Sequence, residues 1–161
     1  MAGDTEPRDL EYGPLTAMGM STEEIDTFLR EEGVGLLSLA DAGDAYAVPI
    51  SFGWDGTSLY FYLFRFGERS KKYDFLDGTE TASFAVYTVE DKYRWRSVVA
   101  TGPLSAVPED EAETVDDVMF DNAWFPNLLP LDEPRTELRR VELAAEQVTG
   151  QQGHGYEHTV G

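Results

Sequence analysis

The spacing of apolar residues changes once along the chain, from a helical repeat to strand-like alternation. Near the N-terminus, three apolar residues share one face of a helix expected over residues 22–32: Ile25, Phe28 and Leu29. Ser21 and Glu24 have the spacing of a capping box at the start of this helix, and Gly33 is a typical stop signal. From Gly33 onward the sequence favours strands.

Five segments rich in β-branched and aromatic residues follow, separated by turn residues: 34–40, 46–54, 58–66, 82–90 and 94–107. The Asp55-Gly56 pair is a strong hairpin signal. Residues 59–64 are apolar on both faces of their strand, which suits a barrel wall that also meets a second surface.

Two more helices are expected over residues 71–76 and 109–120, and a closing strand over 138–148. The pattern therefore predicts a mostly-β barrel with flanking helices. This domain spans residues 21–150, between an N-terminal arm (1–20) and a C-terminal tail (151–161).

Composition narrows the class of protein. A chain of 161 residues fits one domain, and the absence of Cys excludes disulfides, thiol nucleophiles and Cys-based zinc sites. With 31 acidic and 12 basic residues, the net charge of −19 argues against nucleic acid and anionic membranes as partners. Neither a signal-peptide layout nor an apolar run of about 18 residues is present, so we expect a soluble, cytoplasmic protein.

The excess of acidic residues also suggests that the host organism lives in high salt. A surface dense in carboxylates repels itself unless salt screens it, and the Debye length falls to about 3 Å in molar salt. We therefore expect a salt-loving source, such as a halophilic archaeon; an acidic protein of a mesophile is the alternative.

The basic residues are concentrated in one part of the chain. Residues 65–96 contain seven basic and six acidic residues, whereas the rest of the chain contains five basic and 25 acidic residues. All three lysines lie in this window: Lys71, Lys72 and Lys92. An anionic ligand would explain their retention.

Ser70, Lys71 and Lys72 lie where a strand is expected to lead into a short helix. Free backbone N–H groups, a hydroxyl and two ammonium groups suit a phosphate. The alternative is that both lysines only offset nearby acids on a solvated surface.

Aromatic residues gather in the same region, with thirteen of the twenty between Phe52 and Trp95. They could wall a flat ring next to a phosphate, as in a nucleotide-like cofactor, or simply form the core. On the strand after Lys92, Trp95 and Ser97 share one face, which could line a pocket, and the arginines at 94 and 96 share the other, towards solvent or a partner chain. Each of these residues could equally be structural.

Four segments taken together, in this order and spacing, resemble the pyridoxamine 5′-phosphate oxidase-related, FMN-binding split-barrel family, closest to its nitroimidazole-reductase-like branch. They are residues 46–52, 59–61, 70–72 and 95–102. The likeness covers roughly residues 18–150. It implies a Greek-key split β-barrel and a homodimer with FMN at the subunit interface.

The resemblance also implies cofactor contacts at particular positions. Residues of the second expected strand would offer backbone groups to the flavin ring: Val48, Pro49, Ile50 and Ser51. Tyr62 and Leu63 would line the pocket, and Ser70, Lys71 and Lys72 match the family's phosphate motif. Trp95 and Ser97 match its strand contact to the cofactor.

Some features of the family are missing. The arginine that begins the oxidase's second motif is replaced by the Ala47/Val48 region, so vitamin B6 oxidation is not expected. Some relatives bind the deazaflavin F420, and others bind haem through a C-terminal His, which His154 loosely resembles; His154 and His158 are otherwise surface residues of a Gly-rich tail.

Three functions stay open at this point. The first is an FMN-dependent oxidoreductase acting on a small molecule, with no catalytic side chain and no metal, because the flavin would take the hydride. The second is a non-catalytic flavin or nucleotide carrier or sensor. The third is a cofactor-free dimeric structural protein.

Overall fold

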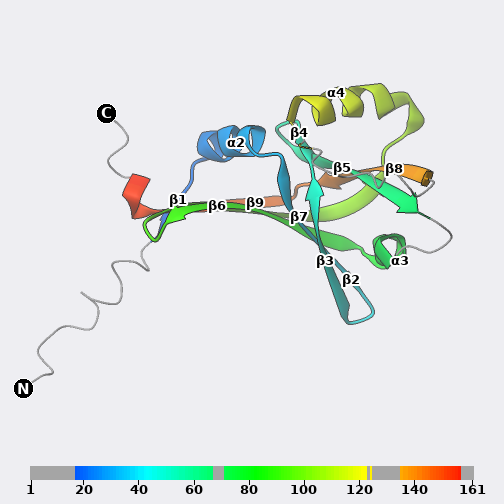
Figure 1. Cartoon of the computed structure of the whole chain (residues 1–161), viewed down its shortest axis with the longest axis horizontal. Coiled ribbons are helices and arrows are strands. Elements are labelled where there is room, and N and C mark those ends of the chain that lie inside the picture. The colour runs from blue at the N-terminus through cyan, green and yellow to red at the C-terminus, as the bar shows by residue number, and fades with distance from the viewer. Residues whose placement is uncertain (1–16, 67–70, 123, 125–134, 157–161) are drawn as a thin grey trace, which may run out of the picture.

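The computed structural model describes residues 17–66, 71–122, 124 and 135–156 (Figure 1). Its helices are α2 (Thr22–Glu31), α3 (Lys71–Gly78) and α4 (Ala112–Asn122), with the 3₁₀ turns η2 (Glu109–Glu111) and η3 (His154–Tyr156). The strands are β1 (Ala17–Gly19), β2 (Val34–Asp41), β3 (Asp44–Ser51), β4 (Gly53–Trp54), β5 (Ser58–Phe66), β6 (Thr81–Asp91), β7 (Arg94–Ala106), β8 (Arg135–Ala144) and β9 (Gln147–Gly153). The expected mostly-β architecture with flanking helices is confirmed.

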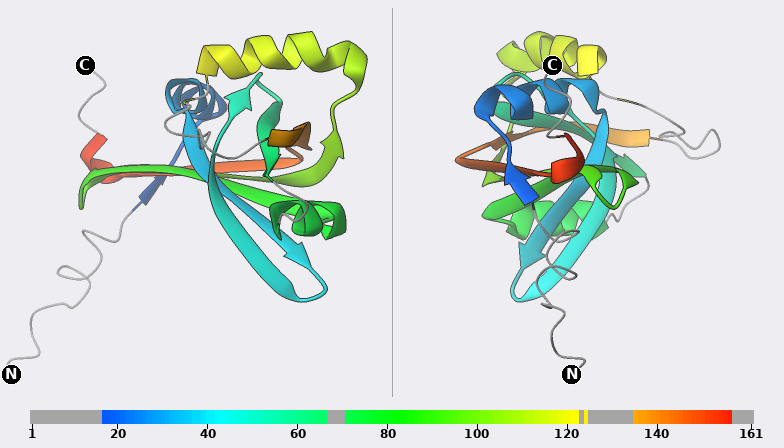
Figure 2. Two further views of the ribbon diagram at one scale, coloured as in Figure 1. Left: turned by 45° about the vertical axis from the view of Figure 1, so that its right-hand side comes forward. Right: turned by 90° about the vertical axis from the view of Figure 1, so that its left-hand side faces the viewer.

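All described strand pairs are antiparallel. The strands follow the order β3-β2-β6-β7-β8-β5-β4, with β9 on β7 and β1 on β9. Because β3 also packs beside β5, the sheet curls back on itself around a core. Helix α4 covers β4 and β5, and α2 lies over the face of the sheet that points to the core (Figures 1 and 2). Helix α3 lies on the far side of the molecule from α4, near the β2–β3 hairpin.

Helix α2 begins where the sequence predicts. The Ser21 hydroxyl accepts from the Glu24 N–H at 3.1 Å, and the Glu24 carboxylate accepts from the Ser21 N–H at 2.9 Å. This capping box satisfies two N–H groups that would otherwise lack a partner at the helix start. The three apolar residues of its inner face are buried: Ile25, Phe28 and Leu29.

The hairpin between β2 and β3 has two turn residues with left-handed backbone, Ala42 at φ 50° and Gly43 at φ 89°. Two such residues form the tight turn whose twist matches that of the flanking strands. Asp41 and Asp44 pair directly across it. The hairpin fixes the register that carries β3 along the edge of the sheet.

Strand β5 is apolar on both faces because both faces are covered, as expected from its sequence. One face points into the core, where Phe61 is fully buried. The other face meets α4, and the Tyr62 hydroxyl donates to Asp116 of that helix. The second surface expected beside this strand is therefore α4.

The expectation of a single closing strand over 138–148 is wrong, since the structure has β8 and β9 with a break at Ala145–Glu146. The cause is β7, which pairs with β9 along its first half and with β8 along its second half. The change of partner occurs at Gly102, where a Cβ atom would lie 1.8 Å from the Ala144 carbonyl oxygen. Only glycine allows this close crossing.

Strand pairing also joins a segment before residue 21 to a segment after residue 150. Ala17–Gly19, in the expected arm, pairs with Gln151–Gly153, in the expected tail. Strand β1 is thus joined to β7 through β9.

Asn122 links three elements in the interior. Its Nδ2 donates to the carbonyl oxygens of Leu29 (3.1 Å) and Glu32, and its Oδ1 accepts from the Trp54 N–H at 2.9 Å. The side chain is buried, so these groups cannot form hydrogen bonds with water instead.

Asn122→Ala is therefore expected to lower the free energy of unfolding by about 2–4 kcal/mol, because it leaves buried backbone groups unpaired. Denaturant titration measures the loss. The exposed neighbour Asp121, changed to Ala, is the control and should cost little. An Asn122→Ala protein as stable as the parent would contradict the role of this side chain.

Candidate functional site

The segment of β3 expected to meet a cofactor has side chains pointing in both directions. Val48 is half-buried and Ile50 is buried, both towards the core, whereas Pro49 is exposed on the outer face. Ser51 is buried, and its hydroxyl donates to the Trp124 carbonyl oxygen. Strand β3 pairs only with β2 among the described strands, so one side of its backbone has no strand partner.

Lys71 lies close to Tyr46 of this strand, although the two are 25 residues apart in sequence. Its Nζ lies 5.4 Å from the ring centroid of Tyr46 on β3 and 5.9 Å from that of Phe75 on α3. The two rings are stacked, with centroids 5.4 Å apart and planes inclined by 24°. The fold thus places Lys71 of the expected phosphate motif beside the strand expected to contact the ring.

Hydrogen bonds fasten α3 in this position. Thr79, directly after the helix, accepts from the Ala40 N–H of β2 at 3.2 Å through its hydroxyl. The Tyr73 hydroxyl donates to the Leu63 carbonyl oxygen of β5 at 2.8 Å. These contacts hold the helix, and with it the Lys71 backbone, between β2 and β5.

Trp95 and Ser97 lie on the outer face of β7, opposite Val89 and Tyr87 of β6. The side chain of Arg96 lies on the inner face, where its Nε donates to Gln152 at 3.1 Å and its guanidinium sits 4.0 Å from the Tyr156 ring centroid. The expected separation of the two faces is confirmed. Of the two arginines expected to face solvent or a partner chain, Arg94 is exposed, whereas Arg96 is half-buried against Gln152 and Tyr156 and so has the structural role that was the alternative.

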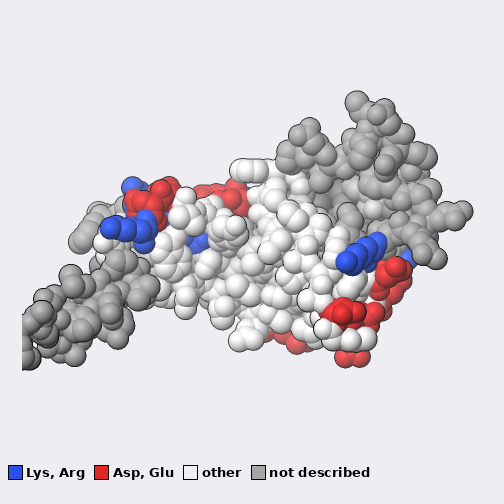
Figure 3. Space-filling model, turned by 60° about the horizontal axis from the view of Figure 1, so that its bottom comes forward, with Lys and Arg blue, Asp and Glu red and all other residues white. Residues whose placement is uncertain are grey.

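The outer face that carries Trp95 and Ser97 has no charged side chain across five strands. Strand register places these residues on it: Ala47 and Pro49 of β3; Leu36 and Ser38 of β2; Ser83, Ala85, Tyr87 and Val89 of β6; Trp95, Ser97, Val99 and Thr101 of β7; and Gln147, Thr149 and Gln151 of β9. We call this set the uncharged face. In Figure 3 it appears as a broad white area with acidic and basic side chains at its margins.

The uncharged face is unusual for this protein in two ways. The chain as a whole has a net charge of −19, yet none of these fifteen residues is Asp, Glu, Lys, Arg or His. Large apolar side chains are also exposed on it, including Tyr87 and Val89, each at 67%. Exposed apolar side chains that lie next to each other mark a candidate interaction site.

Three of the expected cofactor residues share this face, but not one location. Pro49 on β3 and Ser97 on β7 are separated by strands β2 and β6. Three strand spacings correspond to about 14 Å. One ring in contact with Pro49 is therefore remote from Ser97 of the same chain.

The structure does not bring Tyr62 and Leu63 to this face. Leu63 is 1% exposed, and its side chain belongs to the core. The Tyr62 hydroxyl is hydrogen-bonded to Asp116, whose carboxylate also accepts from Arg140 at 2.8 and 3.0 Å. Burial raises the pKa of Tyr62, and the hydrogen bond to Asp116 raises it further. Tyr62 therefore stays protonated at neutral pH.

The Asp116–Arg140 pair makes stability depend on pH. Its hydrogen bonds lower the pKa of Asp116 below the ordinary 3.8, so the pair stabilises the fold fully above about pH 5 and less as the pH falls through the folded-state pKa. The stability lost in Asp116→Asn is therefore expected to be largest near neutral pH and to vanish in acid. Denaturant titrations of parent and variant at several pH values measure this difference. A loss that does not change with pH would contradict it.

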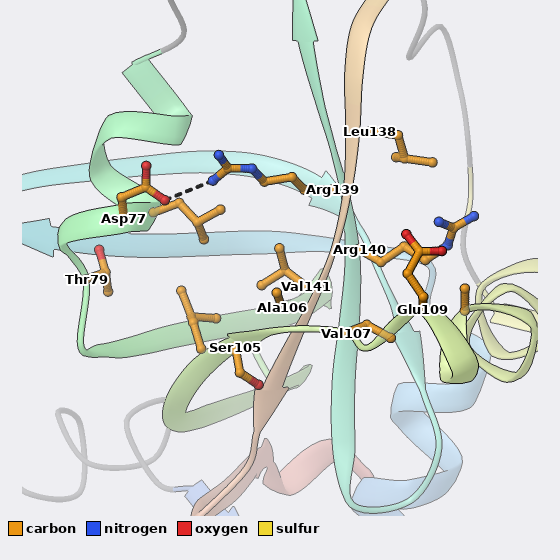
Figure 4. Close-up of a pocket in the computed structure, with 13 residues that line it drawn as sticks. Asp77, Thr79, Ser105, Ala106, Val107, Glu109, Leu138, Arg139, Arg140 and Val141 are labelled. Carbon is orange, nitrogen blue, oxygen red and sulfur yellow. Dashed lines mark hydrogen bonds and ion pairs between the residues drawn. The ribbon is translucent and has the colours of Figure 1, made fainter.

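A separate cavity of about 490 Å³ opens at the far end of α3, between this helix, the end of β7, β8 and the start of α4 (Figure 4). Arg139 reaches across it to Asp77 at 2.9 Å, and Arg140 and Glu109 lie on its opposite side (Figure 4). None of the expected cofactor residues that the structure describes is part of its lining. The cavity is thus distinct from the region around Lys71.

Some expected site residues lie outside the described residues. These are Ser70, the side chain of Lys72, and His158. His154 is described; its ring packs against Tyr93, with centroids 4.8 Å apart. Within the described part of the chain, no helix is long and apolar enough to cross a membrane.

Two features of this region were not predicted from the sequence. One is the contact of Lys71 with the rings of Tyr46 and Phe75, which depends on how α3 packs against β3. The other is the uncharged face. Alternate positions free of charge along residues 83–89 and 95–101 were a signal for it, but only strand register shows that they line up.

Residues 21–152 match the protein family described as pyridoxamine 5′-phosphate oxidase. A comparison with curated protein sequences finds no match.

Solved structures show the same fold. An FAD-binding protein from Mesorhizobium loti is similar with a TM-score of 0.65 and 21% identity, over 85% of this chain and 98% of that chain. A candidate 5-nitroimidazole antibiotic resistance protein from Bacteroides thetaiotaomicron has a TM-score of 0.64 and 15% identity, over 85% and 87%. An FAD and heme binding protein from Mycobacterium smegmatis has a TM-score of 0.63 and 17% identity, over 86% and 74%.

Proposed function

The chain belongs to the pyridoxamine 5′-phosphate oxidase family, and on this premise we propose that it binds FMN and acts as a flavin-dependent oxidoreductase on a small molecule. The observation that carries the proposal is the position of Lys71 beside β3. A cation for a phosphate, aromatic surface, and a strand edge with backbone groups for a ring lie together there.

The residues that are described fit a flavin nucleotide. Lys71 would contact the phosphate, and the backbone of residues 48–51 would hold the ring. A bound flavin would supply the redox chemistry itself. The protein would bind it, orient it and shape the substrate site, and the nitroimidazole-reductase-like branch of the family is our finer assignment.

We further propose that the working unit is a homodimer formed through the uncharged face. A chain with a net charge of −19 that keeps fifteen adjacent side chains uncharged has a surface suited to a second copy of itself. A face-to-face partner could place its Trp95 and Ser97 near Pro49 of the first chain. That arrangement would remove the separation of about 14 Å within one chain.

The absorbance spectrum tests the cofactor. Protein purified in high salt, supplied with FMN and then desalted is expected to keep the flavin bands. A Soret band would instead favour haem, and bands of the deazaflavin from protein supplied with F420 would favour that cofactor. Colourless protein with no affinity for FMN would contradict the proposal and favour a cofactor-free structural role.

Turnover separates the enzyme from a carrier or sensor. The oxidoreductase should oxidise NADH, NADPH or another donor in the presence of an electron acceptor. If the protein binds FMN but no donor reduces the bound flavin, the protein is a non-catalytic flavin carrier or sensor.

We also propose, from the acidic composition, that the protein is more stable at high salt concentration. At about 0.1 M salt the Debye length is about 10 Å, so carboxylates over much of the surface repel each other, and molar salt removes this repulsion. The free energy of unfolding should therefore rise from about 0.1 M to about 1 M KCl. Thermal unfolding across this range checks it, and equal stability throughout would count against a salt-loving source.

A further inference from the structure

Two stacked aromatic rings lie beneath the ammonium group of Lys71. Tyr46 and Phe75 are half-buried and rest against the core, and Lys71, which is exposed, extends over them. The Nζ atom lies within 6 Å of both ring centroids, at 5.4 and 5.9 Å. A cation at this distance from an aromatic face is attracted by the ring.

A lysine side chain on its own is a poor anchor for an anion. It has a flexible four-carbon stem, and holding it still costs rotamer freedom. Contact with two ring faces limits that freedom before any ligand arrives. A group that is already in place loses less entropy when it binds.

We propose that Tyr46 and Phe75 are positioning residues, which hold the Lys71 ammonium ready for the phosphate of a bound flavin nucleotide. The inference rests on the proposed function. The rings act through Lys71 and need not touch the flavin. An ammonium group has three donors, so it can face the rings and still donate to a phosphate.

The two affinities to compare are those for FMN and for riboflavin, which has the same ring but no phosphate. Tyr46→Leu and Phe75→Leu keep an apolar side chain but lose the ring face. Each is expected to weaken FMN binding about threefold to tenfold while the affinity for riboflavin stays the same. Tyr46→Phe keeps the ring face and should retain the parent affinity for FMN.

A matched control exists on the other side of the molecule. Lys92 lies with its Nζ 5.1 Å from the Tyr93 ring centroid, in the β6–β7 hairpin. Tyr93→Leu removes the same kind of contact and should leave the ratio of the FMN to riboflavin affinities unchanged.

A double-mutant cycle separates positioning from general packing. In a Lys71→Ala background, Tyr46→Leu should have no further effect on FMN affinity, because the group that it positions is gone. A cooperative thermal unfolding transition shows that each variant is folded. If Tyr46→Leu does not fold, the single variant Phe75→Leu is the test, and the single variant Tyr46→Phe is its control.

The outcomes distinguish this inference from the proposed function. If the parent binds FMN more tightly than riboflavin and both leucine variants keep that preference, the positioning role is wrong and flavin binding stands. If the leucine variants lose affinity for FMN and riboflavin equally, the rings serve packing only, which also overturns the inference. A parent that binds neither flavin overturns both.

Discussion

Replacing both Lys71 and Lys72 by alanine is expected to raise the dissociation constant for FMN about 100-fold. Each ammonium group that donates to a phosphate contributes about 1.5 kcal/mol, and 1.4 kcal/mol corresponds to a factor of ten. The affinity for riboflavin should change little, because that ligand has no phosphate. Fluorescence titration of both flavins at one fixed salt concentration measures the two constants.

Lys92→Ala provides the control for this double variant. It removes the third lysine of the chain, at the β6–β7 hairpin, and so changes the net charge without touching α3. Its FMN affinity should remain near that of the parent. Equal FMN affinities for parent, control and double variant would remove the phosphate role from α3.

A carboxylate placed in the middle of the uncharged face should have a comparably large effect. Val99 is 40% exposed on β7, with Ala85 beside it on β6. In a dimer formed through this face, Val99→Glu would bury an unpaired charge in each copy, at a cost of several kcal/mol. The variant is expected to be a monomer and to lose FMN affinity with its dimer.

Light scattering after size-exclusion chromatography measures the mass of this variant in high salt. Phe120→Glu is the matched control, because Phe120 is 71% exposed on α4, away from the uncharged face. It should keep the mass of the parent. If Val99→Glu also keeps a dimeric mass, the second copy binds elsewhere.

Local signals in the sequence predicted most elements within a residue or two. The capping box at Ser21 and Glu24 set the start of α2, and alternation in residues 82–90 and 94–107 set β6 and β7. These signals are reliable because they concern neighbours in the chain, such as a side chain and the backbone three residues away.

The closing strand was the clearest failure. Residues 138–148 were expected to form one strand, and no Gly, Pro, Asn or Asp stands at the break at Ala145–Glu146 to indicate a turn. The break arises because β7 takes two different partners along its length. Pairing between strands that are distant in sequence is not encoded in either strand alone.

In the candidate site too, local features were predictable from the sequence and long-range packing was not. The sequence shows where the cations gather, because all three lysines of a chain with 31 carboxylates lie in residues 65–96. Tyr62 and Leu63 were expected to line a cofactor pocket, but the sequence does not show what each side chain contacts. Which side of β5 meets α4 and which meets the core depends on the packing of that helix.

The sequence by itself determined the family, the mostly-β class and the region that carries the cations, because composition, short-range periodicity and motif spacing are properties of the chain. Only the tertiary structure decided that Lys71 rests on Tyr46 and Phe75, and that charge-free positions of five strands form one surface. Both depend on the register and closure of the sheet. Register is fixed by burying one face of every strand at once, which is a property of the folded molecule.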